Sequence, residues 1–169
     1  MILETTEFAP FYKPYIEKAQ KYNSILNGLI DNETETVLFF EGLKPEKLEF
    51  RYAEGKWTPK DILLHLIDAE RIFTYRGLCI ARNDKTSLPG FEEDDYVKEA
   101  NANSRDIKDL IEEFKAVRAT TYIMYKSFTE DQLMRVGKAS DCPVSVRALA
   151  YMTIGHYIHH IQVIKERYL

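Results

Sequence analysis

Two histidines near the C-terminus, His156 and His160, have the spacing of metal ligands. If residues 144–169 form a helix, the two side chains lie about 40° apart at the edge of its apolar face. Imidazoles at positions i and i+4 of a helix can reach one metal ion. His159 lies about 300° from His156 and points off this face, so we predict that it is not a ligand. The alternative is that the pair consists of core histidines that only form hydrogen bonds.

A third histidine, His65, also lies on the apolar face of a predicted helix. Thr58 is a suitable N-cap for this helix and Pro59 suits its first position. The chain then has no glycine or proline until Gly77. In helix bundles, metal sites are built from side chains on facing helices. If the two histidine-bearing helices face each other, His65 completes a three-histidine site.

Two charged residues follow His65 on the same helix, and each has a functional and a structural interpretation. Asp68 could accept a hydrogen bond from a metal-bound imidazole and orient it. Otherwise Asp68 is a solvated carboxylate that pairs with Arg71. Arg76 lies on the His65 side three turns further on, where a guanidinium needs a carboxylate partner or a route to water. We expect Arg76 to form a structural ion pair, and a role in binding an anion stays open.

A site with three histidines predicts an open coordination position. Three neutral imidazoles leave a metal ion its full positive charge, and a bound water or thiol would become a nucleophile near neutral pH. Structural zinc sites usually have four ligands and favour cysteine. The two cysteines, Cys79 and Cys142, have no suitable spacing for such a site. We therefore predict a catalytic rather than a structural metal centre.

Helical periodicity indicates that four long helices position these residues. Weak strand signals and long connections favour an all-α four-helix bundle. Ser24, Thr58, Ser104 and Ser145 are the expected N-caps, and the helices extend over residues 24–42, 58–82, 104–127 and 145–169. Shorter segments join them: a short helix at 8–21, a charged connection at 44–56, a long connection at 83–103, one turn at 129–133 and a loop at 135–143.

Composition limits the function classes. The 169 residues fit one domain covering 1–169, and 45% of them are hydrophobic, which is enough for a sizeable core. The formal net charge of −4 shows no overall excess of positive charge, which would favour binding to nucleic acid or to an anionic membrane. The N-terminus does not have the pattern of a signal peptide, and no apolar run reaches the length of a membrane span. Two unpaired cysteines favour a cytoplasmic protein with reduced thiols.

Two motifs resemble a known family. KWTPKDILLHLIDAER, residues 56–71, resembles the second-helix signature of the DinB-like superfamily of metal-binding bundles. GHYIHH, residues 155–160, resembles the fourth-helix signature of the same group. LPGFEEDDY and VSVRALAYM are similar to connecting segments in one branch of the family. The resemblance covers nearly the whole chain, with the motifs in the same order.

The resemblance implies an up-down-down-up four-helix bundle with a three-histidine site for a divalent metal, nickel or zinc. By motif position the ligands are His65, His156 and His160, in agreement with the helical wheels. It also implies a homodimer and a small-molecule substrate. Characterised relatives include S-transferases and isomerases that use a low-molecular-weight thiol as cosubstrate.

Three functions follow as hypotheses. The first is a metal-dependent enzyme, with a thiol-dependent S-transferase as the leading expectation. The nearest alternative is a metal-dependent hydrolase. The third is a non-enzymatic metal-binding protein of the stress response. A cavity open to the metal site would favour an enzyme, and a closed site would favour the non-enzymatic function.

Overall fold

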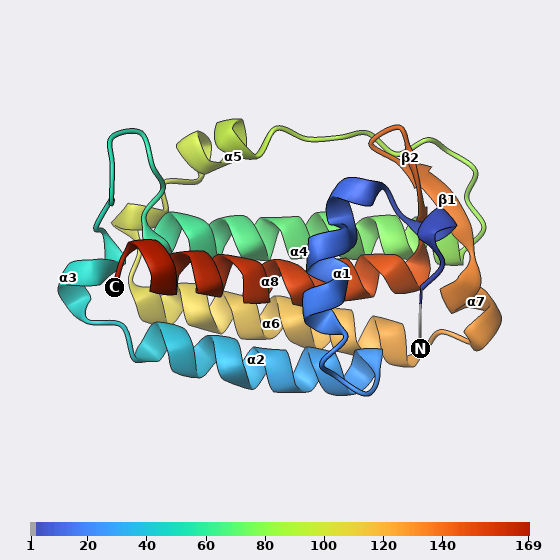
Figure 1. The fold of residues 1–169 in the computed structure, drawn as a ribbon, viewed down its shortest axis with the longest axis horizontal. Helices are drawn as coiled ribbons and strands as arrows, with labels where there is room; N and C mark the ends of the chain where they lie inside the picture. Colours follow the sequence, from blue (N-terminus) through green and yellow to red (C-terminus); the bar gives the residue numbers. More distant parts are fainter. Residues whose placement is uncertain (1–2) are drawn as a thin grey trace.

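Four long helices form the body of the protein in a computed structural model that describes residues 3–169 (Figure 1). They are α2 (Ile25–Glu41), α4 (Pro59–Ala81), α6 (Ile107–Lys126) and α8 (Val146–Arg167). Helix α4 packs against α6 and α8, and α2 packs against the same two helices. In Figure 1, α2 and α8 run in one direction and α4 and α6 run in the other. The predicted up-down-down-up bundle is therefore confirmed.

Side-chain caps start the long helices, and three of the four predicted caps are confirmed. Ser24 and Ser145 each accept a hydrogen bond from the backbone N–H three residues later. Thr58 forms a capping box with Asp61, with both reciprocal hydrogen bonds present. The prediction for α6 is wrong, because its N-cap is Asp106, which accepts from the backbone two residues on.

Ser104 instead ends a short 3-10 helix, η3 (Ala102–Ser104), in the long crossover between α4 and α6. Its hydroxyl donates to the carbonyl of Asn101, and it lies two residues before the N-cap position of α6, which Asp106 occupies. Because α4 and α6 are parallel, the crossover must return along the whole bundle, and it carries α5 (Glu93–Ala100) on the way. Residues 93–96 of the connecting segment LPGFEEDDY therefore lie in a short helix.

The N-terminal segment lies across the bundle. The predicted helix at 8–21 is shorter in the structure: η1 (Thr5–Glu7) and η2 (Pro10–Tyr12) precede α1 (Lys13–Ala19). Helix α1 packs against α8, and the contact depends on Gly155. A Cβ atom on Gly155 would lie 1.8 Å from the backbone oxygen of Tyr15. Only glycine therefore allows α1 to approach the part of α8 that carries the histidine pair.

The loop predicted at 135–143 is a β-hairpin. After α7 (Glu130–Met134), strand β1 (Val136–Ala139) pairs antiparallel with β2 (Cys142–Ser145). Ser140 and Asp141 form its two-residue turn with φ of 50° and 60°, as in a type I′ turn. Such turns usually contain asparagine or glycine, so Ser-Asp gave no hairpin signal.

Two features complete the fold. Helix α3 (Pro45–Leu48) lies in the connection between α2 and α4. Across residues 3–169, every helix is either too short or too polar for a membrane span.

Candidate metal centre

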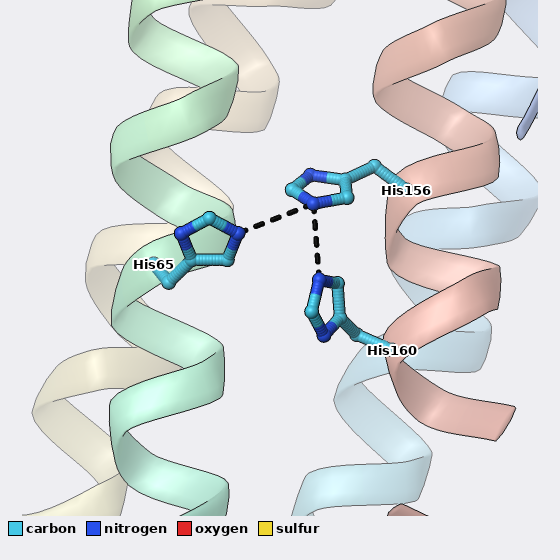
Figure 2. A group of neighbouring side chains, drawn as sticks. All are labelled: His65, His156 and His160. Carbon is cyan, nitrogen blue, oxygen red and sulfur yellow. Dashed lines mark hydrogen bonds between the residues drawn. The ribbon is translucent and has the colours of Figure 1, made fainter. Parts of the chain in front are cut away.

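The antiparallel pair α4 and α8 brings the three predicted histidines together. His65 lies near the N-terminal end of α4, and His156 and His160 lie in the C-terminal half of α8. Because the two helices run in opposite directions and pack against each other, these parts meet at the same depth. Figure 2 shows the three rings pointing toward one another from the two helices.

The Nε2 atoms of the three rings converge. His156 Nε2 lies 3.2 Å from His65 Nε2 and 3.1 Å from His160 Nε2 (Figure 2). The ligand atoms of all three residues lie within 4.8 Å of one another. A tetrahedral ion with metal–nitrogen bonds of about 2.0–2.1 Å holds its nitrogen ligands roughly 3.3 Å apart. The two separations that involve His156 are close to that value.

Hydrogen bonds between neutral imidazoles cannot satisfy all three Nε2 atoms in this arrangement. An imidazole nitrogen carries either one proton or one lone pair. The Nε2 atom of His156 faces two nitrogens, so it cannot form a good hydrogen bond with both at once. Three lone pairs directed at one cation remove this conflict. The residues present therefore fit a divalent metal ion, and His65, His156 and His160 would hold it.

The electrostatic surroundings keep the three imidazoles neutral, which is the form that binds metal. Burial lowers the pKa of His65 to about 4, against the opposing charge of Asp94. Burial, together with His65 and His159, lowers the pKa of His160 to about 3. Burial also lowers the pKa of His156 well below its usual value, and the other three histidines add to this effect.

These shifts predict that the metal-free protein loses stability on mild acidification. Below the ordinary histidine pKa of about 6.5, the unfolded chain binds protons that the folded chain does not. The free energy of unfolding should therefore fall as the pH drops from 7.5 to 5.5, by up to about 1.4 kcal/mol per pH unit for each histidine. Urea denaturation at several pH values measures the slope. A variant with all three histidines replaced by asparagine should have a much smaller slope, and an equal slope in both proteins would contradict the assignment.

A cavity adjoins the three rings and leaves one side of the site open. It has a volume of about 280 Å³, and all four histidines contribute to its wall. The indole of Trp57 lies 4.8 Å from the His65 ring between centroids and stacks with His160 at 6.3 Å. Tyr15 contacts the ring of His156 edge-on at 5.3 Å. The predicted feature that favours an enzyme, a cavity open to the site, is thus present.

Trp57 and Tyr15 were not identified from the sequence. Trp57 directly precedes the N-cap of α4, and this position is the one sequence feature that could have placed it near the site. Its indole N–H donates to Asp94 in α5 at 3.1 Å, so the acidic segment of the crossover fixes an aromatic wall of the site. Tyr15 reaches the site because α1 crosses α8, and the local sequence pattern does not predict that contact. A larger hollow, about 470 Å³, lies beyond Trp57 but contains no histidine in its wall.

The remaining candidates lie in different environments. His159 lies outside the converging trio, with its ring 5.2 Å from Tyr15 and from His160. Asp68 accepts a hydrogen bond from Arg71 at 3.2 Å, which matches the surface ion pair rather than the orienting role. Arg71 also pairs with Glu113 at 2.7 Å. The expected ion pair of Arg76 is wrong, because the hydrogen bonds of its guanidinium go to a carbonyl and a hydroxyl.

Comparison with known proteins decides the family. A sequence profile of the DinB superfamily matches residues 29–164, which is most of the chain and includes all three histidines of the site. The chain belongs to the DinB superfamily. The resemblance carried by the two histidine motifs is therefore confirmed.

Two relatives of this chain are named for metal-dependent hydrolysis. A candidate metal-dependent hydrolase of Geobacillus thermodenitrificans is 27% identical over 131 residues, covering 75% of this chain and 74% of the relative. Another from Geobacillus kaustophilus is 24% identical over 155 residues, covering 89% and 85%. Both names concern those proteins and state no substrate.

Solved structures show the same fold. YfiT from Bacillus subtilis, described as a probable metal-dependent hydrolase with an unusual four-helix bundle topology, superposes with a TM-score of 0.76 at 16% identity. The match covers 89% of this chain and 85% of YfiT. A DinB-like protein from the same species, YjoA, gives a TM-score of 0.59 at 19% identity over 85% and 88% of the two chains. At these identities the likeness concerns the fold alone.

Proposed function

We propose that this DinB-superfamily chain is a metal-dependent hydrolase that acts on a small-molecule substrate. The observation that carries the proposal is the convergence of three Nε2 atoms, from two buried histidines and one half-buried histidine, beside an open cavity. His65, His156 and His160 would bind nickel or zinc, both of which accept imidazole ligands. When bound, such an ion supplies Lewis-acid activation of water near neutral pH.

The protein's own residues would position the substrate and handle protons. Tyr15 and Trp57 form aromatic walls that exclude water from part of the cavity. His159 also lines the cavity, and burial lowers its pKa, so its imidazole is neutral near pH 7. A neutral imidazole beside the reacting groups can accept a proton from them. In this proposal the trio would hold the ion, and His159 is the proton acceptor.

The relatives' names support hydrolysis over the thiol-dependent S-transferase expected from the sequence. Thiol transfer has no support of its own among the comparisons, and it becomes an outcome of the test. The open cavity supports an enzyme over a protein that only stores or senses metal. A homodimer in the cytoplasm remains an expectation from the sequence.

We expect the metal-loaded protein to hydrolyse at least one member of a panel of esters, amides and phosphoesters without added thiol. Activity should disappear after chelation and return with nickel or zinc. Parallel reactions should contain bacillithiol, mycothiol or glutathione. Product formation that requires one of these thiols would replace hydrolysis by thiol transfer. Full activity in a protein shown by metal analysis to be metal-free would contradict both functions.

A further inference from the structure

The protein buries three arginines, and one of them has no carboxylate partner. Arg118 is fully buried and pairs with Glu70, with Nε 2.8 Å from Oε1. Arg147 pairs with the buried carboxylate of Glu7 through two hydrogen bonds. Arg76 is only 3% exposed, yet no carboxylate among residues 3–169 lies within 4.0 Å of its guanidinium. The fold thus neutralises two buried cations internally and leaves the third to another partner.

The guanidinium of Arg76 is held in place with N–H groups to spare. Its Nη2 atom donates to the carbonyl of Pro89 at 2.6 Å and to the hydroxyl of Ser140 at 3.2 Å. Both hydrogen bonds leave from Nη2, and the Tyr12 hydroxyl is a further neighbour that can accept one more. Nε and Nη1 together carry three N–H groups, so at least two of them remain for another acceptor. The rings of Phe73 and Phe91 lie 5.9 Å from the guanidinium carbon. These contacts fix the direction of the group without neutralising its charge.

The position of Arg76 relates it to the metal centre. Arg76 lines the same cavity as the three converging histidines. It follows His65 by 11 positions on α4, or about 16 Å along the helix axis. Phe73 lies between the two, with its ring 6.1 Å from His156. The cavity therefore has histidines toward one end, an apolar wall along α4 and an arginine toward the other end.

The charges around the cavity leave Arg76 uncompensated. Burial lowers the pKa of Arg76, and the nearby Tyr12 hydroxyl offsets this only in part. An arginine stays protonated in proteins, so the cost of burying its charge persists until an anion approaches. Glu93 is an acid that also lines the cavity, but it is exposed, and water screens its charge. Its negative charge contributes to the raised pKa of Tyr12 and of Tyr15, and it forms no ion pair with the guanidinium within 4.0 Å.

We propose that Arg76 forms a carboxylate-binding subsite in the cavity, so that the substrate is a monoanionic organic acid derivative. One guanidinium balances one negative charge, which favours a carboxylate over a phosphate dianion. The apolar wall formed by Phe73 would contact the carbon skeleton between the carboxylate and the hydrolysed bond. The assignment of this anion as the substrate rests on the proposed hydrolase function, whereas the carboxylate-binding subsite does not.

The test compares two probes of the same shape on the metal-free full-length protein. Phenylacetate carries the carboxylate, and phenylacetamide is its neutral counterpart. Metal-free protein is used because a carboxylate could otherwise bind the ion. Isothermal titration calorimetry at low salt should show phenylacetate binding roughly tenfold or more tightly than phenylacetamide. Raising the salt concentration should weaken only the binding of phenylacetate.

Matched variants locate the effect. Arg76→Gln should weaken phenylacetate binding roughly tenfold or more and leave phenylacetamide binding unchanged. Arg82→Gln removes an equal charge from an exposed residue just after the same helix and should change neither. Glu93→Gln should leave phenylacetate binding intact or strengthen it. Circular dichroism establishes that each variant is folded.

A second measurement keeps the proposal testable if Arg76→Gln does not fold. In the wild-type protein, the Nε–H resonance of Arg76 should shift with phenylacetate and not with phenylacetamide. Equal binding of the two probes, or an unchanged Arg76 resonance at saturating phenylacetate, would overturn the subsite. Because these experiments require no turnover, an inactive but phenylacetate-binding protein would reject the hydrolase function and retain the subsite.

Discussion

Replacing His156 with alanine is expected to abolish metal retention and reduce hydrolysis to the level of metal-free protein. The Nε2 atom of His156 is the shared neighbour of the other two Nε2 atoms, at 3.2 and 3.1 Å. Loss of a residue that only supports a ligand typically lowers metal affinity 10–100-fold, so loss of a ligand itself should cost about 100-fold or more. His65→Ala and His160→Ala should behave in the same way.

The measurement is metal content per chain, by mass spectrometry of protein purified without a histidine tag. His159→Ala is the matched control, because it removes a neighbouring imidazole from the same helix. Its ring lies outside the converging trio, so metal content should stay near the wild-type value. Its activity should fall, since His159 is the proposed proton acceptor. A loss of metal in His159→Ala equal to that in His160→Ala would show that the ligand assignment is wrong.

Much of this site could be predicted because the sequence features that indicate it lie within single helices. The i, i+4 pair on α8 and the apolar-face position of His65 depend only on helical periodicity. Thr58 and Ser145 mark where the two helices begin, so they also fix which turns carry the histidines. The up-down-down-up topology came from resemblance instead, because helix periodicity carries no information about the direction in which helices pack.

The features that were missed depend on contacts between distant parts of the chain. Tyr15 reaches the histidines only because Gly155 lets α1 lie against α8. Arg76 was expected to have a carboxylate partner because buried cations usually do, and nothing in its neighbouring sequence showed otherwise. The hairpin that carries Ser140 has an unusual turn sequence, so the hydroxyl that holds Arg76 was placed in a loop. Local patterns predicted which three histidines converge, and the tertiary structure determined the shape of the cavity.

The fully buried pair Arg118–Glu70 gives the largest expected effect on stability. Arg118 lies on α6 and forms two hydrogen bonds to Glu70 on α4, at 2.8 and 3.0 Å. Its Nη1 atom also donates to Leu29 and Asn32 on α2. One side chain thus connects three of the four long helices. Its guanidinium lies 4.8 Å from the ring of Tyr157, which follows His156 in the sequence.

Removing one partner should leave a buried charge without compensation. Glu70→Gln is expected to lower the free energy of unfolding by about 3–5 kcal/mol, measured by urea denaturation of the metal-free protein. Replacing both partners, as in Glu70→Leu with Arg118→Met, removes both charges and should recover a large part of this loss. The recovery should be incomplete, because the carbonyl of Leu29 and the amide of Asn32 lose their donor.

The double replacement also separates a structural role of the pair from a role in the site. If the pair only aligns α2, α4 and α6, the double variant should bind metal with wild-type stoichiometry once it is folded. A double variant that is less stable than Glu70→Gln would contradict the ion-pair account. Such a result would mean that Arg118 stabilises the bundle mainly through packing and its hydrogen bonds to α2.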